Sequence, residues 1–171
     1  MGYRTRRILN GVAQRIDYYD DPAAPPANSI RPSAGTFVTR NGRVLLIRRS
    51  DNGNWSMPGG AQDPGESLTT TAIRETQEET GVTVRITGLV GIFTDPKHVV
   101  HYTSNDEVRQ EFTVIYRAAY QSGTLKNSDE SIDVSWVPID RLESLTMDAS
   151  QRKRIKWALS HTEPWLDDSG D

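Results

Sequence analysis

Three glutamates are grouped in a segment with the composition of a helix. Glu75, Glu78 and Glu79 occupy positions i, i+3 and i+4, and a helix with 3.6 residues per turn places them on one face. Like charges at this spacing repel one another, and Arg74, four residues before Glu78, compensates only in part. The remaining charge suits a hard divalent cation such as Mg²⁺, which prefers carboxylate oxygens as ligands. The alternative is a solvated helix face that carries charge without a ligand.

The segment that carries the glutamates has the signals of a helix with a defined end. No Gly or Pro interrupts residues 67–80, and Leu68, Ala72 and Ile73 can share one face. Gly81 stands where a left-handed terminating residue belongs, so we predict a helix over residues 67–80. Residues 50–65 are too rich in Gly and Pro for regular structure, and we predict an ordered loop there.

The loop and the helix together match a fixed pattern. Residues 60–82 fit G-x5-E-x7-R-E-U-x-E-E-x-G-U, in which x is any residue and U is usually a bulky aliphatic one. The fixed positions are filled by Gly60, Glu66, Arg74, Glu75, Glu78, Glu79 and Gly81. This segment resembles the Nudix box. One position departs from it, because Thr76 stands where the family generally has an aliphatic residue beneath the helix, although a β-branched threonine can still pack there.

The resemblance implies a reaction. Nudix enzymes hydrolyse a nucleoside diphosphate linked to another group, by attack of metal-bound water on one phosphorus of the pyrophosphate. Divalent ions neutralise the pyrophosphate and lower the pKa of the attacking water, so Mg²⁺ is the expected cofactor and Mn²⁺ an alternative. The box is typical of an enzyme, and a catalytically silent nucleotide-sensing module is the alternative, although such modules often lose the carboxylates that this chain retains.

The resemblance also assigns roles within the box. It implies that Glu78 and Glu79 hold metal, that Glu75 is a ligand or the general base, and that the main-chain carbonyl of Gly59 joins them. Glu66 and Arg74 would orient the loop and the catalytic glutamate, as a tightly specified carboxylate site requires.

Three charged residues outside the box are candidates for substrate binding. Arg49 ends a predicted strand just before the loop, where Nudix enzymes often present a phosphate-binding arginine, and its neighbour Arg48 must face the other way. Arg109 opens a later strand with Glu111 on the same face, and the alternative there is a salt-bridged strand end. Glu130 precedes another strand, where the family frequently places a further acidic residue.

Residues 94–107 are predicted to form a loop that recognises the organic part of the substrate. A loop of this length is long for a compact domain, and long ordered loops are commonly functional. It contains His98 and Tyr102, which offer hydrogen bonding and stacking. Simple exposure of His98 is the alternative.

The remaining elements predict an α+β fold. Asn41-Gly42 between two β-rich segments predicts a hairpin, and further strands are expected at residues 82–93, 108–120 and 132–137. Helical stretches follow near residues 139–145 and 150–160. With the resemblance, this order implies a Nudix-type α/β/α sandwich, in which helices flank a mixed sheet.

The two ends of the chain are expected to lie outside that domain. We predict a short helix over residues 3–16 and an irregular strap over residues 20–32, which is a candidate for homodimer contacts. The expected organisation is an N-terminal helix and strap (1–33), a Nudix hydrolase domain (34–160) and a C-terminal tail (161–171).

Composition restricts the classes of protein further. The chain has 171 residues, a formal net charge of −3 and no cysteine, which excludes disulfides, thiolate metal sites and a cysteine nucleophile. Its apolar runs are too short for a membrane span and residues 1–30 lack a secretory signal, so we expect a cytoplasmic protein without membrane contact. The mild negative charge argues against a stable nucleic-acid complex. The expected partner is a nucleotide substrate: a nucleoside polyphosphate, oxidised or not, or a derivative such as ADP-ribose.

Overall fold

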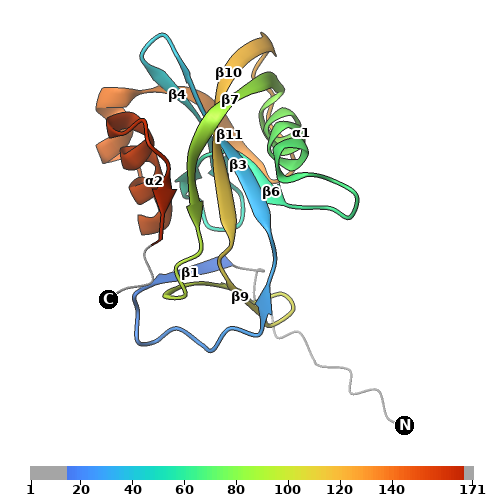
Figure 1. The fold of residues 1–171 in the computed structure, drawn as a ribbon, viewed down its shortest axis with the longest axis vertical. Helices are drawn as coiled ribbons and strands as arrows, with labels where there is room; N and C mark the ends of the chain where they lie inside the picture. Colours follow the sequence, from blue (N-terminus) through green and yellow to red (C-terminus); the bar gives the residue numbers. More distant parts are fainter. Residues whose placement is uncertain (1–14, 168–171) are drawn as a thin grey trace.

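A mixed β-sheet forms the centre of the molecule (Figure 1). The structure is a computed structural model that describes residues 15–167. The main strands, in spatial order, are β11 (Ser131–Pro138), β4 (Arg43–Arg49), β3 (Ser33–Arg40), β10 (Thr113–Gly123), β7 (Val82–Phe93) and β12 (Trp165–Leu166). The β3–β10 and β7–β12 pairs are parallel and the others antiparallel. Short strands β5 (Trp55–Ser56) and β6 (Gly59–Ala61) pair with β4 and β3.

Helices α1 (Leu68–Thr80) and α2 (Ala149–Ser160) lie on opposite sides of this sheet (Figure 1). Strand β4 shows why both faces need cover, because its four central residues are all buried. Val44 and Leu46 belong to a hydrophobic cluster that includes Ile155 of α2, whereas Leu45 and Ile47 belong to a second cluster on the other face. The predicted arrangement, a mixed sheet flanked by helices, is confirmed.

The predicted local elements are largely confirmed. Strands β3 and β4 form the expected hairpin, with positive φ angles of 51° at Asn41 and 70° at Gly42. The Ser67 side chain caps α1, and Gly81, at φ 74°, ends the helix by donating its N–H to Gln77. The helical stretch expected near residues 139–145 is a 3₁₀ helix, η1 (Ile139–Ser144). No helix within residues 15–167 is long and apolar enough to cross a membrane.

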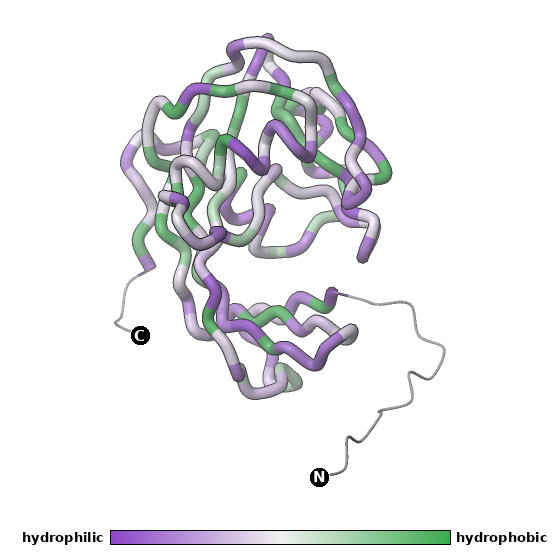
Figure 2. Tube along the Cα trace, turned by 90° about the vertical axis from the view of Figure 1, so that its right-hand side faces the viewer, coloured by the Kyte–Doolittle hydropathy of each residue, from purple (hydrophilic) through white to green (hydrophobic). Residues whose placement is uncertain are grey.

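A second, smaller sheet lies below the main body in both views (Figures 1 and 2). It consists of β1 (Arg15–Tyr19), β8 (His98–Tyr102), β9 (Glu107–Gln110) and β2 (Ser29–Ile30). The predicted N-terminal helix lies outside the described residues except at positions 15 and 16, where the structure has a strand instead. The reason is that β1 pairs with β8, more than 80 residues away.

The small sheet corrects two further predictions. Residues 94–107 are not one loop, because β8 occupies their centre, and Val99 and Val100 of that strand are buried. The strand expected over residues 108–120 is broken at residues 111 and 112, where the chain leaves the small sheet and enters β10 of the main sheet.

The unusual box residue, Thr76, is fully buried and its hydroxyl is satisfied. Its Oγ1 lies 2.6 Å from the Thr36 hydroxyl and donates to the Ala72 carbonyl at 2.7 Å. Thr76 thus packs under the helix as an aliphatic residue would, with a polar partner on strand β3.

Thr76→Val is expected to lower the free energy of unfolding by about 1–2 kcal/mol, because the buried Thr36 hydroxyl loses its partner. The double variant Thr36→Val/Thr76→Val should recover most of that loss, since both polar groups are then removed. Urea denaturation of the wild type, both single variants and the double variant measures the coupling. Strictly additive losses would contradict the pairing.

Candidate active site

A cleft of about 350 Å³ lies where the two sheets, α1 and the start of α2 meet. Several residues singled out from the sequence line it: Arg49, Gly59, Glu75, Tyr102, Arg109 and Glu130. They come from β4, β6, α1, β8, β9 and the loop before β11, so the fold brings together side chains from most of the chain. Glu66, Arg74, Glu78, Glu79 and His98 do not line the cleft.

Arg74 is the centre of the box interactions. Its Nε donates to Glu66 at 2.7 Å, and its Nη1 donates to Glu75 at 2.8 Å and to Glu78 at 2.9 Å. Hydrogen bonds from Arg74 and Thr71 lower the pKa of Glu66 to about 2. One guanidinium therefore joins the box loop to two glutamates of α1, and it holds Glu75 toward the cleft.

Glu79 lies behind the cleft wall and is only 3% exposed. Its Oε2 accepts a hydrogen bond of 2.8 Å from the Gly59 N–H. Burial raises the pKa of Glu79 to about 8, the negative charges of Glu75 and Glu130 add to the rise, and the Gly59 hydrogen bond and the charge of Arg49 oppose it. The surrounding side chains of the protein thus compensate the negative charge of the Glu79 carboxylate only poorly.

This raised pKa has a consequence for the stability of the metal-free protein. A carboxyl whose pKa rises on folding, here from 4.5 to about 8, favours the fold fully below pH 4.5, and that contribution is lost as the pH rises through 8. Glu79→Gln removes the titration, so we expect the variant to exceed the wild type in Tm by several degrees at pH 8.5 and by much less at pH 5.5. Thermal unfolding with a chelator present measures both differences. An equal difference at the two pH values would show that Glu79 does not titrate in this range.

Glu75 packs directly against the box loop. Burial raises the pKa of Glu75, and the hydrogen bond from Arg74 acts in the opposite direction. A Cβ atom at position 60 would come within 2.5 Å of the Glu75 carboxyl group. Only glycine leaves room for the Glu75 side chain in this position.

The box carboxylates do not form a complete metal cage by themselves. Within residues 15–167, no three acidic or histidine side chains converge in an arrangement ready to hold a metal ion, and Glu78, with a side chain that is 60% exposed, turns to Arg74. The chemistry of the group nevertheless fits a divalent cation. Glu75 and Glu79 are hard oxygen donors with raised pKa values, and a cation would supply the charge that they lack.

Two of the arginines singled out from the sequence also line the cleft. Arg49 donates from Nε and Nη2 to Asp51 at 2.9 and 2.6 Å, whereas Arg48 turns away and donates to the Gly53 carbonyl. Arg109 donates twice to Glu107 at 2.8 Å, and its guanidinium lies 4.5 Å from the centre of the Tyr102 ring. Arg49 and Arg109 are therefore each fixed in orientation by a carboxylate.

His98 is not brought to the cleft. It is 3% exposed, its Nε2 lies 3.0 Å from the Asp17 carboxylate, and its ring meets that of Tyr19 edge to face. The expectation that His98 contacts substrate is not supported, because β8 turns this side chain toward β1.

Other cleft residues carried no local signal in the sequence. Arg15, Ser56, Asp148 and Arg154 all line the cleft. Asp148 immediately precedes α2, a position at which aspartate is common for capping alone, and Arg154 lies within that helix. In the described part of the chain, Ser56 Oγ and Arg154 Nε are buried without a hydrogen-bond partner. The cleft wall therefore contains polar atoms that are not used by other protein groups.

Fold and site together define a hydrolase of the Nudix class, with an acidic helix, a glycine-rich loop and several arginines around one cleft. Comparison with known proteins agrees, because the NUDIX domain model matches residues 29–158. The chain belongs to the Nudix family, whose members are hydrolases acting on phosphoanhydride bonds.

Individual relatives extend this comparison. The chain is 33% identical over 122 residues to a MutT-like protein of Streptomyces ambofaciens, covering 71% of each chain. It is 28% identical over 124 residues to a Bacillus subtilis (strain 168) protein proposed to be an 8-oxo-dGTP diphosphatase, covering 71% of this chain and 76% of the relative. The crystal structure of a MutT protein from Methanosarcina mazei Go1 superposes with a TM-score of 0.62 at 25% identity, covering 78% of this chain and 96% of the other.

Proposed function

We propose that the protein hydrolyses the pyrophosphate linkage of a nucleoside polyphosphate or of a nucleoside diphosphate derivative, with a divalent metal ion. The observation that carries this proposal is a single cleft lined by both carboxylates and guanidinium groups. Glu75 and Glu130 line it, with Glu79 behind its wall, and so do Arg49 and Arg109. A diphosphate bound there would meet both a metal held by carboxylates and guanidinium donors.

The metal would be Mg²⁺ or Mn²⁺, held by Glu75, Glu78, Glu79 and the carbonyl of Gly59. When bound, it supplies positive charge to the diphosphate and increases the acidity of the attacking water. Arg74 would keep Glu75 and Glu78 in place through the hydrogen bonds described above. The alternative role for Glu75, which lines the cleft, is that of the general base that accepts the proton of that water.

The cleft arginines and Tyr102 would bind the rest of the substrate. Arg49 would contact phosphate, and Tyr102 with Arg109 beside its ring would offer a flat surface and N–H donors to a base or sugar. The name of the B. subtilis relative, an 8-oxo-dGTP diphosphatase, supports ranking nucleoside triphosphates, oxidised or ordinary, ahead of ADP-ribose as candidate substrates.

A substrate screen tests the proposal. Purified protein with Mg²⁺ is incubated with nucleoside triphosphates, oxidised nucleotides, ADP-ribose, dinucleotides and nucleotide sugars, and the products are separated by chromatography. We expect cleavage of at least one compound at the diphosphate, abolished by a chelator and restored by added metal. Tight nucleotide binding without turnover would instead identify a nucleotide-sensing module.

A further inference from the structure

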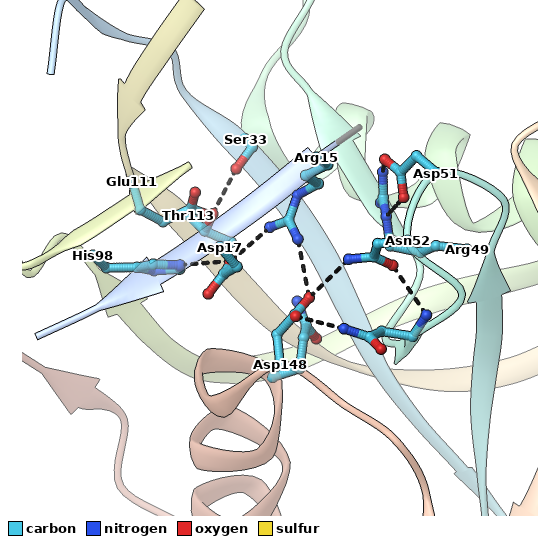
Figure 3. Close-up of polar contacts among 12 residues, drawn as sticks. Arg15, Asp17, Ser33, Arg49, Asp51, Asn52, His98, Glu111, Thr113 and Asp148 are labelled. Atoms are coloured by element: carbon cyan, nitrogen blue, oxygen red, sulfur yellow. Dashed lines mark hydrogen bonds and ion pairs between the residues drawn. The ribbon is translucent and has the colours of Figure 1, made fainter. Parts of the chain in front are cut away.

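Arg15 is a cleft residue that belongs to the N-terminal strand. It is the first residue of β1, its side chain is 10% exposed, and it lines the same cleft as Arg49. Its Nη2 donates to Asp17 at 2.9 Å and its Nη1 donates to Asp148 at 3.0 Å (Figure 3). Two carboxylates therefore fix this guanidinium at the cleft wall.

Asp148 connects Arg15 to the turn that carries Arg49. The Asp148 carboxylate also accepts a hydrogen bond from Asn54 at 2.6 Å. It accepts another from Asn52 at 3.4 Å (Figure 3). The Asn54 carbonyl in turn accepts the main-chain N–H of Arg49 at 2.9 Å. Asp148 thus bonds to the Arg15 side chain directly and to the turn after Arg49 through Asn52 and Asn54, whereas the Arg49 side chain itself is held by Asp51.

The charge of Arg15 acts on Arg49. Burial and the charge of Arg15 both act to lower the pKa of Arg49, but the hydrogen bond and charge of Asp51, with a contribution from Glu79, raise it above its ordinary value. Bringing two buried guanidinium groups near each other is unfavourable unless something negative compensates. Pairs of oriented arginines are well suited to bind a phosphate, which accepts several N–H donors at once.

We propose that Arg15 and Arg49 together bind the phosphate of the substrate that lies farther from the carboxylates of α1. This inference rests on the proposed function, and it makes β1 part of the substrate site, although Arg15 lies outside the residues 29–158 matched by the NUDIX model. The substrate diphosphate would then span the cleft, with one phosphate toward Glu75 and the other held by the two guanidinium groups.

The test measures anion binding without metal as well as kinetics. In the presence of a chelator, we expect Arg15→Met to weaken the binding of inorganic pyrophosphate, measured by calorimetry, at least about tenfold. With Mg²⁺ and the best substrate of the screen, KM should rise by a similar factor while kcat stays within about threefold. Arg49→Met should behave alike, and the double variant should be less than additive, because both residues serve the same phosphate.

Arg117→Met is the matched control. Arg117 also anchors α2, but at its other end, where it donates to the carbonyls of Ala158 and His161, and it does not line the cleft. This variant should lower Tm about as much as Arg15→Met does. Its affinity for pyrophosphate should stay at the wild-type value. If Arg15→Met does not fold, Arg15→Lys replaces it, because lysine keeps the positive charge near Asp17 and Asp148 but loses the planar fork.

The outcomes separate this inference from the proposed function. Pyrophosphate affinity that is unchanged in the folded Arg15 variant, or no pyrophosphate binding by the wild type, would overturn the inference even if nucleotides are hydrolysed. Arg15-dependent pyrophosphate binding by a protein that hydrolyses no compound in the screen would support the inference and contradict the proposed function.

Discussion

Glu79→Gln is expected to lower kcat at least about 100-fold, the scale for loss of a metal ligand or general base. The neutral amide keeps the size of the side chain and can still accept the hydrogen bond from the Gly59 N–H, so the fold should survive. What is lost is the negative charge, which burial makes costly and which a bound cation would compensate. Steady-state kinetics over a range of Mg²⁺ concentrations give both kcat and the apparent metal affinity, and Glu75→Gln should cause a loss of similar size.

Glu143→Gln provides the control for this experiment. Glu143 is an exposed carboxylate that pairs with Arg152 and Lys156 near the start of α2, away from the cleft. Its neutralisation should leave kcat unchanged. Unaltered turnover in a folded Glu79→Gln protein would refute the assignment of Glu79 to the metal site.

Arg74→Lys is expected to lower kcat roughly 10- to 100-fold, the range found when a residue that orients metal ligands is changed. Lysine retains the charge but has a single ammonium group in place of the planar guanidinium. It cannot reproduce the separate hydrogen bonds that Arg74 donates to Glu66, Glu75 and Glu78. Glu75 would then lose its fixed orientation toward the cleft. Kinetics should be measured together with circular dichroism, which we expect to show unchanged secondary structure.

The matching control is Arg85→Lys. Arg85 is an exposed residue of β7, the strand that follows the box in the sequence. This change should alter neither activity nor Tm. If Arg74→Lys also shows wild-type kinetics, Arg74 only balances surface charge, and its contacts with the three glutamates have no catalytic consequence.

Much of the candidate site could be predicted from the sequence because its determinants are local. The spacing of Glu75, Glu78 and Glu79, the uninterrupted helix and the terminating Gly81 all follow from periodicity and capping over neighbouring residues. The Asn41-Gly42 hairpin is equally local, and the alternation of β4 is enough to separate Arg49 from Arg48.

Burial of the glutamates was decided by the tertiary structure. Helical spacing places all three on one face, yet Glu79 is buried against Gly59 and Glu78 is largely exposed beside Arg74. This difference depends on where β6 passes along α1, and it accounts for the raised pKa of Glu79. Charge spacing alone contains no information about that neighbour.

The small sheet and the Arg15 network were likewise decided only by long-range contacts. Arg15 meets Asp148 across 133 residues, and His98 meets Asp17 across 81. Such contacts leave no periodic pattern in the chain. The role of each polar residue becomes visible only when folding brings its distant partner beside it. The sequence by itself therefore determined the box, its helix and the class of chemistry, whereas packing of distant segments decided which arginines face the cleft and which histidine does not.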